Sequence, residues 1–129
     1  MSDVYLAGPY SGTPEQEDQN YDLHMKAFAE LHRLGIAVFA PIVHSHEAAR
    51  RYDLGGDWVA WADIDRRHIE AAKELWVLMI PGWSASRGTT AEVNFAKAIG
   101  KSFRYVQPSR LAAEAERFIA ERRGALLHD

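Results

Sequence analysis

The chain has 129 residues, 47% of them hydrophobic and 26% charged, and it carries a formal net charge of −3 with no cysteine. A chain of this size can fold as one domain that buries roughly two-thirds of its unfolded surface. The slightly acidic balance gives no general attraction to a nucleic acid polymer, and the lack of thiols excludes disulfides, thiol nucleophiles and thiolate metal sites. No stretch approaches the roughly 20 apolar residues of a membrane span. We therefore expect a single cytoplasmic domain over residues 1–129 that binds neither membranes nor nucleic acid polymers.

Four short apolar runs bounded by breaking residues predict buried β-strands. The first is Val4–Ala7, stopped by Gly8 and Pro9, and the second is "IAVFAP", ended by Pro41. The third and fourth runs are "LWVLMI", Leu75–Ile80, and "SFRYVQ", Ser102–Gln107. Each run is followed, directly or after a connection, by a segment whose apolar residues have helical spacing.

This helical spacing predicts four helices. They begin at about Glu15, at Trp58 after an N-capping Asp57, at Thr89, and near Leu111, with Gly35 and Gly100 ending the first and third. The segment His44–Gly56 is polar and contains glycine, which indicates a loop with at most one helical turn. The closing sequence "ERRGALLHD" indicates a loosely held tail.

Strands that alternate with helices of ten or more residues predict a three-layer α/β fold of the Rossmann or flavodoxin type, with a parallel sheet of four to five strands. Ligands of such sheets bind outside the carboxyl ends of the strands. The loops that leave those ends, 8–12, 42–46 and 81–88, should therefore share one crevice. The ligand-contact candidates in the first two loops are Gly8, Tyr10, His44 and His46.

Glu92 allows two interpretations. Together with Thr89 it has the T-x-x-E spacing of a helix capping box, in which two side chains satisfy each other's backbone donors. Alternatively, the carboxylate points into the crevice, and the positive end of the helix dipole keeps it ionised at neutral pH. An ionised carboxylate can attack an anomeric carbon and form a covalent glycosyl intermediate.

Asp65 interrupts an otherwise apolar helical stripe that runs from Trp58 to Ala72. A carboxylate on such a face needs an ion-pair partner or a polar ligand, because burying an unpaired charge is very costly. The nearest cations are two arginines at 66–67, which lie elsewhere on the helical wheel, and Lys73, which is eight residues away. A polar ligand in the crevice therefore explains Asp65 as well as an ion pair does.

His44 and His46 have an i,i+2 spacing that metal ligands can show, but no third histidine or compact carboxylate accompanies them. We therefore expect them to form hydrogen bonds with the protein or a ligand, and we expect no metal. Trp58, Trp61 and Trp83 could stack on a planar base or belong to the core, as large aromatic residues commonly do. Of the three, we expect Trp58 to contact the ligand. No dinucleotide-binding, Walker A or Ser/His/Asp motif is present.

Three short motifs follow one another along the chain: "VYLAGPY" at the first strand, D-x-x-x-I-x-x-A at Asp65–Ala72, and S-x-G-x-x-x-E at Ser86–Glu92. In this order and spacing they resemble the nucleoside 2-deoxyribosyltransferase-like superfamily, which includes deoxynucleoside monophosphate N-glycosidases. The resemblance extends from Val4 to about Val106. The segments "PIVHSH" and "GGDW" are similar to those of its small, uncharacterised members.

The resemblance implies cleavage or transfer of the N-glycosidic bond of a nucleoside or nucleotide. Glu92 would attack C1 of the sugar, Tyr5 would orient the carboxylate, and Asp65 would bind the sugar or help to protonate the departing base. Ser86, Gly88 and nearby amides would hold a hydroxyl or phosphate group. No metal or organic cofactor is implied, and a homodimer or homotetramer is expected.

The sequence departs from the family pattern at Lys73, where members usually have an aspartate after the alanine, so contacts behind the site differ. A non-catalytic module that binds or senses a nucleotide or nucleotide-sugar in the same crevice is the alternative function. An enzyme for another glycosylated substrate is a third. The base, the choice between hydrolysis and transfer, and the need for a 5′-phosphate stay open.

Overall fold

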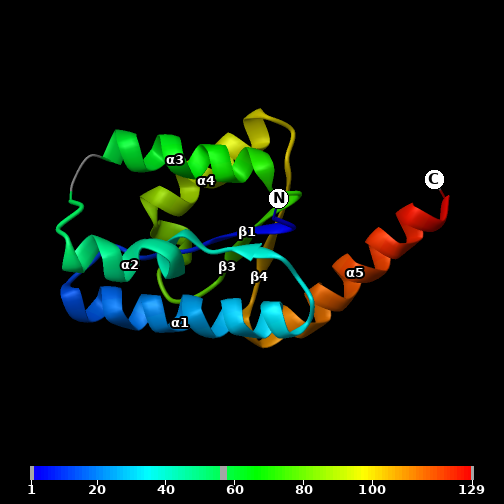
Figure 1. Ribbon diagram of the computed structural model, residues 1–129, viewed down its shortest axis with the longest axis horizontal. Coiled ribbons are helices and arrows are strands. Elements are labelled where there is room, and N and C mark those ends of the chain that lie inside the picture. The colour runs from blue at the N-terminus through cyan, green and yellow to red at the C-terminus, as the bar shows by residue number, and fades with distance from the viewer. Residues whose placement is uncertain (1, 56–57, 129) are drawn as a thin grey trace.

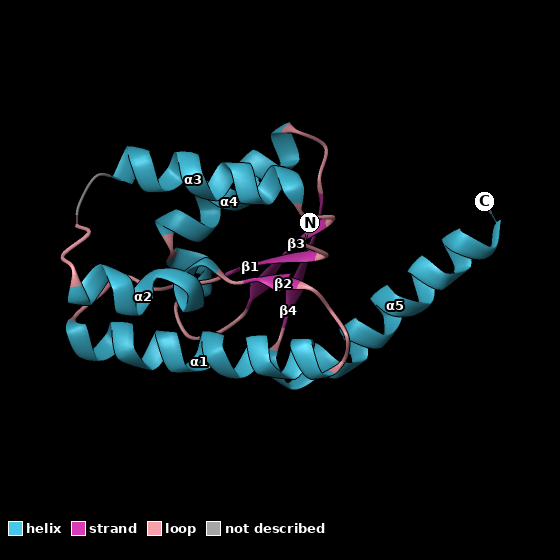
Figure 2. Cartoon of the chain, viewed as in Figure 1, coloured by secondary structure: helices cyan, strands magenta, loops and turns pink. Residues whose placement is uncertain are grey.

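The structure is a computed structural model that describes residues 2–55 and 58–128, except for the side chains of Trp58 and of residues 125–128. Figures 1 and 2 show its strands and helices. In chain order these are β1 (Val4–Ala7), α1 (Pro14–Arg33), β2 (Val38–Phe39), α2 (Pro41–Arg51), α3 (Trp58–Ala71), β3 (Glu74–Leu78), α4 (Arg87–Ala98), β4 (Ser102–Val106) and α5 (Leu111–His128). Short 3₁₀ turns, Trp83–Ala85 and Pro108–Arg110, precede α4 and α5.

The four strands form one parallel sheet in the order β2-β1-β3-β4. From β1 the chain moves outward to β2 and then crosses back to β3 on the other side of β1. The strand order therefore reverses between β1 and β3, and ligands of open α/β sheets bind at such a switch point. The predicted three-layer α/β fold of the Rossmann or flavodoxin type is confirmed, with four strands.

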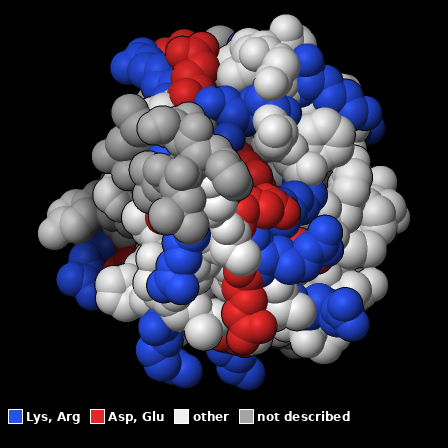
Figure 3. Space-filling view, turned by 90° about the vertical axis from the view of Figure 1, so that its right-hand side faces the viewer, with Lys and Arg blue, Asp and Glu red and all other residues white. Residues whose placement is uncertain are grey.

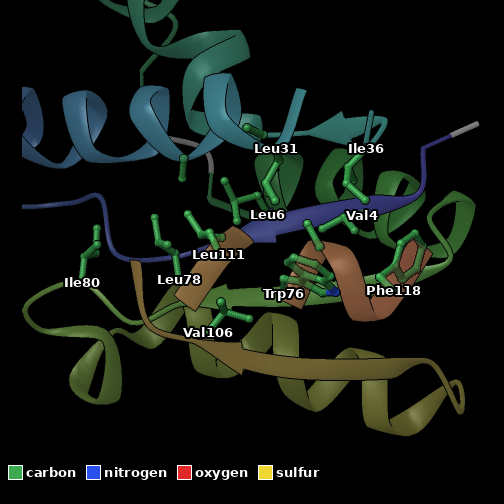
Figure 4. Packing of buried hydrophobic residues seen from close by; sticks show 13 residues of the cluster. Val4, Leu6, Leu31, Ile36, Trp76, Leu78, Ile80, Val106, Leu111 and Phe118 are labelled. Carbon is green, nitrogen blue, oxygen red and sulfur yellow. The ribbon is translucent and has the colours of Figure 1, made fainter. Parts of the chain in front are cut away.

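Alternate residues of β1 pack on opposite faces of the sheet, because successive side chains of a strand point in opposite directions. Val4 and Leu6 lie in a core with α1 and α5, whereas Tyr5 and Ala7 lie in a second core with α3 and α4. Figure 4 shows the first core, in which Leu31 of α1 lies toward Leu6. All four β1 side chains are buried. Because of this alternation, the Tyr5 side chain lies on the face of the sheet that α4 covers.

The segment predicted as a loop after the second strand is largely helical, because α2 occupies Pro41–Arg51. Pro41 ends the strand and also takes the first helical position, where its fixed φ and missing N–H suit a helix start. The run "EAARR" that follows consists of strong helix formers. The loop prediction was wrong because most polar residues of α2 lie on its exposed face. His44 and His46 therefore lie on a helix.

Two helix boundaries also differ from the prediction. α4 begins at Arg87 and not at Thr89, because the Ser86 side chain accepts a hydrogen bond from the backbone N–H of Thr89 and acts as the N-cap. α5 continues to His128 through the segment predicted as a tail. Gly124 does not end it, because one helical glycine costs only about 1 kcal/mol and strong helix formers surround it.

Ion pairs attach α5 to the sheet. Arg104 of β4 donates hydrogen bonds to Glu74 of β3 and to Glu114 and Glu121 of α5, and the bond to Glu74 contributes most to raising the pKa of Arg104. The end of α5 extends away from the rest of the molecule (Figures 1 and 2). Figure 3 faces that end and shows acidic and basic side chains interspersed. This surface therefore lacks the single-sign charge that would attract a charged polymer.

A buried histidine fixes the loop that follows β1. His24 of α1 is completely buried, and its Nε2 donates to the carbonyl oxygen of Pro9 at 3.2 Å. Burial lowers the pKa of His24 to about 4, so the ring is neutral near pH 7. A Cβ on Gly8 would lie 2.8 Å from two atoms of this ring. Glycine is therefore required where the loop passes the ring at the carboxyl end of β1.

Gly8→Ala is expected to destabilise the protein by about 1–3 kcal/mol, because the added methyl group forces the His24 ring or the strand end to move. Gly124→Ala is the matched control, since nothing lies within 4 Å of a Cβ there. It should leave the free energy of unfolding unchanged or raise it by up to about 1 kcal/mol. Urea unfolding followed by circular dichroism measures both variants. Equal stability of the two would contradict the role given to Gly8.

Candidate active site

A cleft of about 1150 Å³ lies at the carboxyl ends of β1 and β3, the switch point of the sheet. It is lined by the end of β1 and the following loop, by α2 and α3, and by the first turns of α4 with the loop before them. The sequence-predicted residues that line it are Gly8, Tyr10, His46, Asp65, Ser86, Gly88 and Glu92. The fold thus brings segments that are far apart in the sequence to one place.

The central contact of the cleft joins β1 to α4. The Tyr5 hydroxyl donates a hydrogen bond to Oε2 of Glu92. Tyr5 is completely buried behind the cleft, and Val93, the residue after Glu92, packs in the same core. Burial raises the pKa of Tyr5 well above its ordinary value, and the charges of Glu92 and Asp65 raise it further. The phenol therefore keeps its proton and stays a donor to Glu92.

Burial raises the pKa of Glu92 to about 8. The hydrogen bond from Tyr5 lowers this pKa and the charge of Asp65 raises it, but burial has the largest effect. The expectation that the helix dipole keeps Glu92 ionised at neutral pH is therefore wrong for the free protein. Because α4 begins at Arg87, Glu92 is its sixth residue and lies beyond the first turn, where the dipole acts.

Asp65 of α3 is partly buried in the same cleft, and this burial raises its pKa to about 6. Among the described residues it has no hydrogen-bond or salt-bridge partner. The neighbouring cations are engaged elsewhere: Arg67 bonds to Asp63, Lys73 pairs with Asp3, and Arg66 lies over the ring of Phe95. Within the described structure the ion-pair explanation thus has no support, and Asp65 is available to a polar ligand.

The T-x-x-E spacing does not form a capping box. Ser86 caps α4 through its hydrogen bond with Thr89 N, at 3.2 Å, while Glu92 bonds to Tyr5. Thr89 is only 3% exposed and lines the cleft, and its Oγ1 has no partner among the described residues. This hydroxyl, together with the backbone amides of Arg87 and Gly88, is therefore available to a polar group of a ligand.

The two histidines of α2 have different surroundings. His46 lines the cleft and its Nδ1 lies 2.7 Å from the Tyr10 hydroxyl. His44 is exposed and its ring centroid lies 5.5 Å from that of Phe39; it is not among the described residues that line the cleft. The side chain of Trp58, a predicted ligand contact, and the predicted N-cap Asp57 lie outside the described structure.

The residues that line the cleft but were not predicted site residues include Trp61, Arg66 and Arg87. Trp61 precedes Asp65 by four residues, so the two share a face of α3. That spacing is a sequence signal for Trp61, although the position of Trp58, seven residues before Asp65, predicts the same face. Arg66 was expected to point elsewhere on the helical wheel, and its long side chain nevertheless reaches the cleft.

The chain belongs to the family described as a domain of unknown function (DUF1937), whose model matches residues 2–107. The match extends through β4 and includes all the described residues that line the cleft. No curated protein matches the chain. In the described part of the chain, no group of three or more His, Asp or Glu side chains could hold a metal ion, and no helix is long and apolar enough to cross a membrane.

Substitutions on the two sides of Glu92 should move its pKa in opposite directions. Tyr5→Phe removes a hydrogen bond that stabilises the carboxylate and should raise the pKa above about 8. Asp65→Asn removes a neighbouring negative charge and should lower it, each change being roughly one pH unit. Carbon-13 NMR titration of the glutamate carboxyl groups measures both, with Glu116→Gln on the exposed surface of α5 as control. Shifts of the same sign would contradict this electrostatic arrangement.

Proposed function

We propose that this protein cleaves or transfers the N-glycosidic bond of a nucleoside or nucleotide, with Glu92 as the nucleophile. The observation that supports this most directly is the hydrogen bond between Tyr5 and Glu92 inside a cleft that also holds Asp65. These residues come from the three motifs that resemble the nucleoside 2-deoxyribosyltransferase-like superfamily. Tyr5 is the only hydrogen-bond donor to Glu92 among the described residues and bonds to Oε2, so Oε1 has no hydrogen-bond partner there.

In the first step, an oxygen of ionised Glu92 forms a bond to C1 of the sugar. Tyr5 bonds to Oε2, which leaves Oε1 to attack. The bond between C1 and the base nitrogen breaks, its electron pair passes to the base, and protonated Asp65 donates a proton to the departing base. In the second step, water or another base attacks C1, the bond from C1 to the Glu92 oxygen breaks and its electron pair returns to the carboxylate, and the proton of the attacking group passes to the Asp65 carboxylate. Water gives hydrolysis and a second base gives transfer.

The remaining cleft residues suit the two parts of such a substrate. Thr89 Oγ1 and the amides at the start of α4 offer hydrogen bonds to a sugar hydroxyl or a phosphate group. Trp61 offers an indole ring to a planar base on the same face of α3 as Asp65. The reaction as written uses only side chains of this chain and no cofactor.

Glu92→Gln should reduce release of free base at least about a thousandfold, because the amide cannot act as the nucleophile. Mass spectrometry of a panel of deoxynucleosides and their 5′-monophosphates measures the released base, and a sugar adduct on the peptide that contains Glu92 identifies the nucleophile. Glu116→Gln, on the exposed surface of α5, is the matched control and should react at the parent rate. Thermal unfolding of each variant confirms that it is folded.

Unchanged turnover of Glu92→Gln would overturn the proposed role of Glu92. A parent protein that these compounds stabilise against thermal unfolding, but that releases no base on long incubation, would instead indicate the non-catalytic binding module. The two functions are thus separated by product formation and not by binding.

The proposed roles also predict a pH profile. Glu92, with a pKa of about 8, must lose its proton, and Asp65, with a pKa of about 6, must keep its proton. We expect kcat/KM to rise up to about pH 6, to change little between pH 6 and 8, and to fall above pH 8. Asp65→Asn should remove the fall at high pH. A parent profile that rises through pH 8 and then stays level would contradict proton donation by Asp65 and assign it to sugar binding.

A further inference from the structure

A chain of three polar side chains leads from the surface of α1 into the cleft. Asp18 of α1 lies 3.5 Å from Nε2 of His46 on α2, and His46 Nδ1 lies 2.7 Å from the hydroxyl of Tyr10. His46 is only 4% exposed, while Tyr10 lines the cleft. Arg50 bonds to Asp18 at the outer end. The three residues thus connect an exposed ion pair to the ligand space.

The imidazole at the centre of this chain is firmly held. Its ring stacks on Tyr21 of α1, with a centroid distance of 4.1 Å and an angle of 15° between the planes. The Tyr10 backbone is also fixed, because its carbonyl oxygen accepts a hydrogen bond from Asn20 at 3.1 Å. The orientation of His46 therefore does not depend on a ligand.

The partners of His46 determine which of its nitrogens carries the proton. The Asp18 carboxylate can only accept, so it favours a proton on Nε2. In the neutral ring Nδ1 is then an acceptor, and the Tyr10 hydroxyl must donate to it. Burial and the charge of Glu17 raise the pKa of Tyr10, so the phenol has its proton to donate.

A tyrosine hydroxyl that donates its single hydrogen to histidine has only lone pairs left for other partners. The carboxylate and imidazole behind it polarise this oxygen and strengthen it as an acceptor. The Tyr10 oxygen is therefore available as a hydrogen-bond acceptor for a ligand in the cleft.

We propose that Tyr10 is a specificity residue that accepts a hydrogen bond from a donor group of the bound ligand, and that His46, oriented by Asp18, is its positioning residue. The ligand class rests on the proposed function: the donor is an amino group of a base or a hydroxyl group of a sugar. If a ligand has only an acceptor group at this position, neither that group nor the Tyr10 oxygen has a hydrogen-bond partner. The residues on the α3 and α4 side of the cleft bring the reacting groups, whereas this chain selects the ligand.

The tautomer of His46 tests the arrangement without any ligand. Two-dimensional proton–nitrogen NMR of the imidazole at pH 8 should show Nε2 protonated and Nδ1 unprotonated. In Tyr10→Phe the Nδ1 resonance should shift because its hydrogen-bond donor is lost. His32, exposed near the end of α1, is the internal control whose resonances stay unchanged. A proton on Nδ1 of His46 in the parent protein would overturn the proposal.

Binding tests the role of Tyr10 toward the ligand. Calorimetry with the Glu92→Gln protein, which keeps its ligand intact, uses the four 2′-deoxynucleosides and their four 5′-monophosphates. For the tightest binder, Tyr10→Phe should weaken affinity about three- to tenfold, the range of a single hydrogen bond. Tyr52→Phe, a tyrosine that is 73% exposed, should change it less than about twofold. Analogues of the same compound that each lack one donor identify its source: the loss caused by Tyr10→Phe should disappear for the analogue without the base amino group or for one without a sugar hydroxyl.

His46→Asn should abolish most of the effect of Tyr10→Phe in a double-mutant cycle, because Tyr10 is then no longer held as an acceptor. Equal affinities of the parent and Tyr10→Phe proteins, or a loss of affinity that persists with every analogue, would overturn the role given to Tyr10. The proposed function would still be supported if the wild-type chain released base. Dependence of binding on Tyr10 without any base release would overturn the proposed function alone. Failure of all eight compounds to bind would overturn both.

Discussion

The hydrogen bond from Tyr5 to Glu92 is the interaction on which the arrangement of the cleft depends. It joins the central strand to α4 across the core, and it supplies a partner to a carboxyl group that would otherwise be buried alone. Burial favours the protonated carboxyl group, whereas the phenol favours the carboxylate, and the balance leaves the pKa of Glu92 at about 8. An acidic group that changes its charge close to neutral pH is useful for chemistry and difficult to explain as a structural contact.

The cleft owes its position to strand order. Because β1 and β3 are neighbours and their connections leave to opposite sides, the loops after them separate and leave space at the carboxyl ends. The carboxyl groups of α3 and α4 occupy one part of this space, and the Tyr10 and His46 side chains line another, with Asp18 outside the cleft beside His46. We propose the first group as the one that reacts with a sugar carbon. The second is a chain of polar contacts that the reaction itself does not require, which is why we assign it to ligand selection.

Rigid packing behind the cleft holds these side chains in fixed positions. The neutral, buried ring of His24 supports the loop after β1, and the loop can approach it only because Gly8 has no side chain. Ser86 determines where α4 begins, and therefore which of its side chains face the core and which face the cleft. The ion pairs of Arg104 hold α5 against the opposite face of the sheet, away from the ligand space. Side chains that line a ligand-binding cleft are commonly positioned by a rigid scaffold of this kind.

The sequence by itself determined the alternation of strands and helices, because strand and helix periods and breaking residues are local properties. It therefore predicted the α/β class and the crevice at the strand ends, whereas the common place of Tyr5, Asp65 and Glu92 was implied by the family resemblance of the three motifs. Its errors had local causes as well: Pro41 was interpreted as a strand end although it also starts α2, and Thr89 as a cap although Ser86 has that role. Only the tertiary structure decided that Glu92 bonds to Tyr5, that burial outweighs the helix dipole, and that His46 faces the cleft while His44 does not. Burial and partners depend on residues distant in sequence, and the pKa of a carboxyl group follows from them.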